Sequence, residues 1–395
     1  MTGKPALGGG VIRARIGVSV SGRQIGSRER LFLAVAHALA ERGWPVDVLA
    51  AGPEPALREA VAPPIRLVDL SPGGLQGLRV PHLLRLTLGV PALARWIEEH
   101  HPALLFSTSI PPNLAALTAA GRSRWEVPVV VRQSNTIRVE GHPRYGGLRR
   151  RWRDPWIPRM YREAAHVIAV AGEVADNLAA LDAADPADVT VIPNAVELSD
   201  AFERAAEVPE HPWFDRHESP LVVSVGRLVR KKDHGTLLEA FARLRRDRPA
   251  RLVVLGEGPM RQRLETAVAR LGLSEDVAFP GHATNPFSPV ARADLFVLSS
   301  ISEGMPSALI EALACGTPVV STDCPSGPRE ILGEGRFGEL VAVGDVGALA
   351  AAMARQLDAP RDREALRARA RDFELDRAVE RYVALLEGVA GDRGA

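Results

Sequence analysis

Residues 295–322 read LFVLSSISEGMPSALIEALACGTPVVST, which is an apolar run, a short polar turn, a helical pattern and a second apolar run. A strand, a helix and another strand in this order build a parallel sheet. Pro306 suits the first turn of a helix, and the N–H groups of Met305, Ser307 and Ala308 would then face outward. Free N–H groups at a helix N-terminus bind anions. The stretch therefore predicts an anion site at the carboxyl end of a strand.

Two glutamates flank this site. Glu303 sits at the mouth of the predicted helix, and Glu311 lies about two turns further along the same face, inside the apolar run ALIEALACG. Gly304 would let the backbone approach a ligand closely. A carboxylate near a sheet edge can bind ribose hydroxyls, and one at the helix mouth can bind those of a sugar. We interpret the pair as binding the two ends of a nucleotide sugar; the alternative is a Glu303 that complements the helix dipole and a solvated Glu311.

A second loop carries the cations. The stretch VGRLVRKKDHGTLLEAF leaves a strand at Gly226, places Arg227 and Lys232 in the turn and enters a helix. Arginine offers a planar fork and lysine a mobile point charge, so the two can clamp a diphosphate. A solvated run of Arg230, Lys231 and Lys232 explains this loop about as well.

The whole chain repeats the alternation of short apolar runs with helical patterns, which predicts two doubly wound α/β domains with parallel sheets. We expect a first domain over residues 1–198, a second over 199–373, and a C-terminal helix within 374–395 that packs back on the first. The predicted strands are RIGVSV, PVDVLAA, IRLVDL, ALLFS, VPVVVR, HVIAVA and VTVIP, followed by LVVSVG, RLVVLG, VAFPG, LFVLSS, TPVVST and FGELVAV.

Composition limits the class of protein. The 395 residues are 46% hydrophobic and 25% charged, which is globular and long enough for two domains. A net charge of +1 argues against a dedicated nucleic-acid binder. Cys315 and Cys324 are too few for a disulfide framework, and no apolar run reaches membrane-spanning length. We expect a cytoplasmic protein that is neither exported nor integral to a membrane.

The motifs resemble those of a known family. VIPNAVE, VGRLVRKKDHGTLLEAF, VLGEGP and LFVLSSISEGMPSALIEALACGTPVVSTDCPSGPREIL are similar to stretches of glycosyltransferase family 4, retaining nucleotide-sugar transferases of the GT-B fold. The resemblance covers most of residues 160–390 in order and spacing. It implies two Rossmann-like domains that face a cleft, a nucleoside diphosphate sugar as donor, in particular a UDP-sugar, and a glycan or lipid-linked acceptor.

The resemblance also implies roles for single residues. Arg227 and Lys232 would hold the donor diphosphate, Glu303 would contact the transferred sugar, and these three would form the catalytic group. Glu311 would hold the ribose. The residues assigned in this way to the donor site are Gly26, Ser27, Gly226, Arg227, Lys232, Gly256, Glu257, His282, Glu303, Gly304, Met305, Pro306, Ser307 and Glu311.

The first domain departs from the family pattern at two places. The loop GSRER has Ser27 after Gly26 where members often carry a second glycine. The stretch RQSNT has Ser134 where many members have a histidine that positions the reacting sugar, with Arg132 and Asn135 as substitutes on the acceptor side. Two alternatives stay open: a nucleotide-sugar epimerase of related fold, and a nucleotide-sugar-binding protein that has lost catalysis, which these two departures suggest.

Metal, cofactor and membrane expectations follow. The chain has no Asp-x-Asp motif, so we expect a metal-independent enzyme without a cofactor, in which cations and helix N-termini neutralise the diphosphate.

Residues 138–164 hold eight arginines and three carboxylates, a net charge of +5, interleaved with Trp152, Trp156 and Tyr161. This mixture predicts loose binding to an anionic membrane surface; an ordinary helix with solvated arginines is the alternative.

Overall fold

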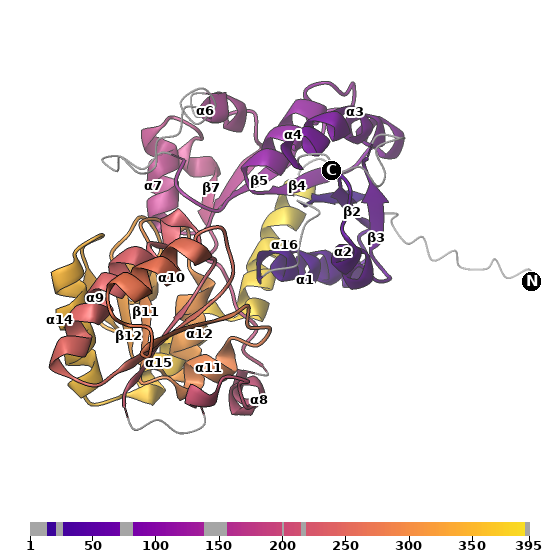
Figure 1. Cartoon of the computed structure of the whole chain (residues 1–395). Coiled ribbons are helices and arrows are strands. Elements are labelled where there is room, and N and C mark those ends of the chain that lie inside the picture. The colour runs from indigo at the N-terminus through magenta and orange to yellow at the C-terminus, as the bar shows by residue number, and fades with distance from the viewer. Residues whose placement is uncertain are drawn as a thin grey trace, which may run out of the picture. The chain divides into compact units, whose positions relative to one another are not determined.

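A computed structural model describes residues 14–20, 27–71, 82–137, 156–199, 201–214 and 219–391. It contains two parallel sheets with helices packed around them (Figure 1). Each predicted strand is present in one of these sheets. The prediction of two doubly wound α/β domains is therefore confirmed at the level of the sheets.

The first sheet has seven strands in the order β3-β2-β1-β4-β5-β6-β7. Its strands are β1 (Ile16–Ser19), β2 (Val46–Ala50), β3 (Arg66–Asp69), β4 (Leu104–Thr108), β5 (Val129–Gln133), β6 (His166–Ala169) and β7 (Val189–Val191). The α-helices between them are α1 (Ser27–Glu41), α2 (Pro55–Ala60), α3 (His82–His100), α4 (Ile110–Ala120), α6 (Trp156–Tyr161) and α7 (Gly172–Ala180). The central strands β1 and β4 are buried along their whole length, which explains their continuous apolar sequence.

The second sheet has six strands in the order β10-β9-β8-β11-β12-β13. They are β8 (Leu221–Val225), β9 (Arg251–Leu255), β10 (Val277–Gly281), β11 (Leu295–Leu298), β12 (Val319–Thr322) and β13 (Glu339–Val341). The α-helices of this half are α8 (Ala201–Ala206), α9 (His234–Asp247), α10 (Arg261–Arg270), α11 (Phe287–Arg292), α12 (Ser307–Cys315), α13 (Pro328–Ile331), α14 (Val346–Asp358) and α15 (Arg363–Ala370), and α16 (Leu375–Gly391) follows them in the chain. The chain order reverses between β8 and β11, which are hydrogen-bonded neighbours.

Two groups of helices cover the second sheet (Figure 1). Helices α9, α10 and α14 pack together on one side, and α11, α12 and α15 form the other group. In α9, Leu237, Leu238 and Phe241 recur at helical spacing and enter the same core as Val222 and Val254 of the strands. This core fixes where α9 begins, and with it the loop that follows β8.

By proximity of its residues, the chain divides into two compact units. One consists of Met1–Arg132, Met160–Val167 and Val379–Ala395, and the other of Gln133–Arg159 and Ile168–Ala378. The end of α16 belongs to the first unit, where Tyr382 packs against Phe106 with ring centroids 5.7 Å apart. The predicted boundaries near residues 198 and 373 stay a prediction.

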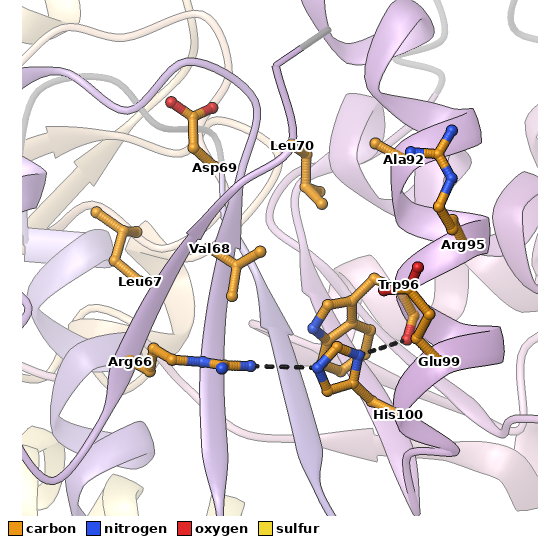
Figure 2. Close-up of a pocket in the computed structure, with 10 residues that line it drawn as sticks. All are labelled: Arg66, Leu67, Val68, Asp69, Leu70, Ala92, Arg95, Trp96, Glu99 and His100. Carbon is orange, nitrogen blue, oxygen red and sulfur yellow. Dashed lines mark hydrogen bonds between the residues drawn. The ribbon is translucent and has the colours of Figure 1, made fainter. Parts of the chain in front are cut away.

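The first unit has a cavity of about 470 Å³ beside the edge strand β3 (Figure 2). Arg66 and His100 reach across it, with Nη2 of the arginine 3.4 Å from Nε2 of the histidine. Arg66 also forms two hydrogen bonds to the fully buried carboxylate of Asp47, which accepts a third from Trp96. Arg66 therefore serves to hold β3 to β2 and α3.

In the described part of the chain, no helix combines the length and the apolar character that crossing a membrane requires.

Candidate active site

The carboxyl ends of β8 and β11 lie side by side because the two strands pair in the middle of the second sheet. In open α/β sheets, ligands bind outside the carboxyl ends of strands where the strand order reverses. Two loops leave the sheet at this point, one from Gly226 to Asp233 and the other from Ser299 to Pro306. The first loop contains Arg227 and Lys232, and the second contains Glu303.

Lys232 and Glu303 form an ion pair between these loops. The Lys232 Nζ atom lies 2.6 Å from Glu303 Oε1, and Lys231 Nζ lies 3.6 Å from Oε2 of the same carboxylate. The Ser300 hydroxyl donates a further hydrogen bond of 2.6 Å to Oε1. Glu303 is 5% exposed, so this is a nearly buried carboxylate with three polar partners.

The charges of this cluster are strongly coupled. Burial by itself would raise the pKa of the Glu303 carboxyl group, but the ammonium groups of Lys232 and Lys231 outweigh it and hold the pKa below its ordinary value. Burial lowers the pKa of Lys231, against the opposing attraction of Glu303. Glu303 is therefore a carboxylate at neutral pH.

Glycines make room for the cations. A Cβ atom on Gly226 would lie 3.2 Å from Cε of Lys232, so the lysine stem packs directly over the strand end. Gly256, which follows β9, has a φ of +143°. A Cβ there would lie 2.1 Å from the Gly226 carbonyl oxygen, so no side chain fits. These two glycines hold the loops after β8 and β9 in close contact.

Helix α12 begins at Ser307 with Pro306 as its N-cap residue, as the sequence predicts. Glu303 lies before the helix, in the loop, so the prediction that both glutamates share one helix face is wrong. Glu311 lies one turn inside α12 and is 8% exposed, which rules out a solvated side chain. Burial raises the pKa of Cys315 to about 12, and the nearby charge of Glu311 acts in the same direction.

Two contacts that the sequence analysis missed secure the loop before α12, and all of their residues belong to the second unit. A Cβ atom on Gly304 would lie 1.7 Å from the Ser134 carbonyl oxygen, so the two backbones touch. The Asn194 side-chain amide donates a hydrogen bond of 2.5 Å to the Met305 carbonyl. Asn194 belongs to VIPNAVE, and a polar residue between two apolar runs was the available sequence signal.

The other residues assigned to the donor site lie at the same sheet edge. Arg227 is exposed, and no described residue forms an ion pair with its guanidinium group. Glu257 pairs with Arg261 at 2.7 Å, which reduces its availability to a ligand. His282 directly follows β10 and is exposed.

The three residues predicted for the acceptor side lie in different surroundings. Arg132 is 1% exposed; its Nε donates to the Tyr382 hydroxyl at 2.7 Å, and its guanidinium stacks on the Phe32 ring at 5.3 Å. These contacts favour a structural role. Ser134 and Asn135 follow β5 and are half-buried, with Ser134 against Gly304.

Some predicted residues cannot be placed. Gly26 lies outside the described residues, and Ser27 is described only as the first residue of α1. Residues 138–155 of the basic segment, including Trp152, also lie outside them. In the described part of that segment Trp156 is 61% exposed, whereas Tyr161 is fully buried and its hydroxyl accepts a 2.7 Å hydrogen bond from Asn113. Tyr161 is therefore not part of a membrane-facing surface.

Among the described residues, no group of three or more histidine, cysteine, aspartate or glutamate side chains is arranged to hold a metal ion.

Comparison with known proteins identifies the family. Residues 29–200 match the family model described as Glycosyltransferase Family 4, and residues 210–373 match the model described as Glycosyl transferases group 1. Together the two models cover most of the chain, which therefore belongs to glycosyltransferase family 4.

A curated relative is N-acetylgalactosamine-N,N'-diacetylbacillosaminyl-diphospho-undecaprenol 4-alpha-N-acetylgalactosaminyltransferase of Campylobacter jejuni, 37% identical over 158 residues. The match covers 40% of this chain and 41% of that protein, so it spans less than half of the relative's length.

Solved structures share the fold over nearly the whole chain. Sucrose-phosphate synthase from Thermosynechococcus elongatus has a TM-score of 0.79 at 21% identity, covering 96% of this chain and 100% of that chain. The Anabaena protein HepE, solved with UDP-glucose, has a TM-score of 0.74 at 18% identity, covering 95% and 99%. At these identities the likeness shows the fold, which is GT-B.

Proposed function

We propose that this chain is a retaining glycosyltransferase that moves a sugar from a UDP-sugar to a hydroxyl acceptor. One observation carries the proposal: Lys232 and Glu303 meet 2.6 Å apart where the strand order of the second sheet reverses. In a chain of glycosyltransferase family 4, this pair supports a role for Lys232 as the cation for the diphosphate and for Glu303 as the carboxylate for the sugar.

Each residue of the site has one task in this proposal. Lys232 and Arg227, which has no ion-pair partner among the described residues, bind the donor diphosphate, together with the N–H groups at the start of α12. Glu303 accepts hydrogen bonds from hydroxyls of the transferred sugar. Glu311, buried one turn inside α12, binds the ribose hydroxyls.

The chemistry needs stabilisation of the leaving group. The bond between the anomeric carbon and the diphosphate oxygen breaks, and negative charge develops on the diphosphate beside Lys232 and Arg227. Donors preorganised at such a position are each worth about 3–4 kcal/mol of transition-state stabilisation. A bond from the acceptor oxygen to the anomeric carbon forms on the same face, and the diphosphate takes the acceptor's proton, so configuration is retained. We propose that these groups suffice without a metal ion.

Two comparisons support the choice of donor and acceptor. HepE shares the fold and was solved with UDP-glucose, which favours a UDP-sugar. The name of the Campylobacter relative describes transfer to a sugar linked to diphospho-undecaprenol, which favours a lipid-linked or surface glycan precursor as the acceptor. Such an acceptor would place the protein in the cytoplasm, at the inner face of the membrane.

The test is a panel of UDP- and GDP-sugars incubated with the protein, with and without EDTA, while released nucleotide is measured. We expect release from a UDP-sugar, unchanged by EDTA and lost in Lys232→Ala. Conversion of the donor into an isomeric nucleotide sugar without release would instead indicate an epimerase. Calorimetric binding of UDP with no turnover of any donor, even with lipid-linked acceptors, would indicate a binding protein.

A further inference from the structure

A second cavity lies on the α9, α10 and α14 side of the second sheet (Figure 1). Its volume is about 620 Å³, and its walls come from the first turn of α9, from α10, from the segment that enters α14 and from the two loops of the candidate active site, at Val229, Arg230, Lys231, Asp233 and Ile301. Neither Lys232 nor Glu303 lines it, so the cavity adjoins the candidate active site but does not include its ion pair. Lys231 lines the cavity and also lies 3.6 Å from Glu303, and it is the side chain that connects the two.

Basic side chains dominate this cavity. Its charged lining residues are Arg230, Lys231, Arg263, Arg270, Asp233 and Glu239, four cations against two carboxylates. Arg230, Arg263 and Arg270 are exposed, and within the described part of the chain nothing forms a hydrogen bond or ion pair with their guanidinium groups. By contrast, Arg261 of the same helix α10 is neutralised by Glu257 and Glu265. Three arginines without a partner among the described residues give this cavity a positive charge, which favours an anionic ligand.

Helix α9 adds its N-terminus to the same cavity. The Asp233 side chain does not cap the helix backbone; it accepts a 2.8 Å hydrogen bond from the Thr236 hydroxyl instead. The first N–H groups of α9 therefore receive no hydrogen bond from the Asp233 side chain. His234, which lines the cavity, is 3% exposed, and its Nδ1 atom has no hydrogen-bond partner. A buried polar atom of this kind is commonly satisfied by an ordered water or a bound group.

We propose that this cavity binds a small phosphorylated molecule whose phosphate lies between Arg263, Arg270 and the first turn of α9. Arg263 and Arg270 are seven residues apart on α10, so they project from the same face of the helix. Planar guanidinium groups bind phosphate oxygens in pairs, which matches a doubly charged phosphate. The two carboxylates reduce the positive charge without cancelling it, which favours a phosphate over a neutral ligand.

The experiment is a calorimetric titration with inorganic pyrophosphate while UDP is held at saturation, because UDP fills the proposed donor site. We expect pyrophosphate to bind, and Arg263→Ala/Arg270→Ala to weaken it at least tenfold. The matched control is Arg243→Ala/Arg246→Ala, which removes two exposed arginines of α9 that do not line the cavity. Equal affinity in both double variants, or no binding to the wild type, would overturn the proposal.

Failure of the proposed function can be told apart from failure of this site. If UDP itself does not bind, the same titration is run in Lys232→Ala, which removes the donor clamp and leaves the cavity intact. Loss of pyrophosphate binding on changing Arg263 and Arg270 in that background would still support the cavity site.

Vesicles distinguish the source of the phosphate. Phosphatidylglycerol vesicles that sediment with the wild type, and not with Arg263→Ala/Arg270→Ala, would assign the phosphate to a lipid head group. Equal sedimentation of both proteins, combined with weakened pyrophosphate binding in the variant, would assign it to a free phosphorylated molecule.

Discussion

The Lys232 ammonium lies 2.6 Å from the Glu303 carboxylate. Both side chains are largely shielded from water, at 15% and 7% exposure. A donor diphosphate must therefore share or replace an existing partner of Lys232. This one contact therefore links the affinity for nucleotide to the ion pairing of Glu303.

The first prediction concerns the ion pair itself. Lys232→Ala should lower the free energy of unfolding by about 3 kcal/mol, because it leaves a buried carboxylate with weaker partners. Adding Glu303→Gln should recover part of this loss, since the unpaired charge is then gone. Urea unfolding of both single variants and the double variant measures the coupling. Additive effects in this cycle would show that the pair contributes nothing.

The second prediction concerns UDP binding by Lys232→Ala. A charge-assisted hydrogen bond is worth about 1.5–3 kcal/mol, so the variant should bind UDP at least tenfold more weakly. Calorimetry at a temperature where the variant is fully folded gives the affinity. If the variant binds UDP like the wild type, the diphosphate lies elsewhere.

The third prediction divides the roles of the glutamates. Glu311→Ala should weaken binding of free UDP, because it removes a ribose partner. Glu303→Gln should preserve UDP affinity or improve it, since Lys232 loses its competing partner, while turnover of the sugar donor falls. Binding and donor turnover are measured for both variants. An equal loss of UDP affinity in the two variants contradicts this division.

The fourth prediction concerns Gly304. A Cβ atom at this position would lie 1.7 Å from the Ser134 carbonyl oxygen, so Gly304→Ala must push the two segments apart. We expect a loss of about 3 kcal/mol in stability, together with a loss of turnover. Gly388→Ala is the control, because a Cβ there meets no atom within 4 Å in helix α16. The control should be neutral, or more stable by about 1 kcal/mol.

The fifth prediction is a pH dependence of stability. Burial lowers the pKa of His234 to about 4 from its ordinary 6.5, and the charge of Lys232 acts in the same direction. Between pH 6.5 and pH 4, the unfolded chain therefore binds a proton at this histidine that the folded chain does not. The free energy of unfolding has its full value above pH 6.5 and falls by about 3 kcal/mol as the pH drops to 4. Denaturant unfolding across this range should show a flatter profile for His234→Phe. Parallel profiles would refute the assignment.

The sixth prediction concerns the membrane and rests on the sequence of residues 138–164. The protein should sediment with anionic vesicles at low salt and be released as salt rises, because each arginine near such a surface contributes about 1 kcal/mol that salt screens. Changing Arg149, Arg150 and Arg151 to Ala should abolish sedimentation. Sedimentation unchanged by these substitutions would leave a membrane-independent acceptor.

Sequence reasoning predicted the sheets well because strand and helix patterns are local. Each strand of a buried parallel sheet is a short apolar run, and such a run can be recognised in the sequence without knowing which strands lie beside it. The proximity of the two loops was also predictable, since the cations after β8 and Glu303 after β11 follow strands that the fold makes neighbours. The family resemblance then gave each residue a role, and these roles remain proposals.

The contacts around Glu303 were not predictable in the same way. The contact of Gly304 with Ser134, and the hydrogen bond from Asn194 to Met305, join segments more than 100 residues apart. No periodicity in the sequence encodes such pairings. The start of α12 was predicted correctly, but the assignment of Glu303 to the same helix face as Glu311 was not, because a loop between strand and helix has no period that fixes where its side chains lie.

Lys231 is a charged side chain that the candidate active site shares with the cavity lined by α9 and α10. A phosphate in the cavity lined by α9 and α10 would attract the same ammonium group that lies 3.6 Å from Glu303. If the cavity ligand changes the affinity for nucleotide by some factor, the nucleotide must change the affinity for the cavity ligand by the same factor. The second domain would then respond to the supply of a phosphorylated metabolite as well as to its own donor.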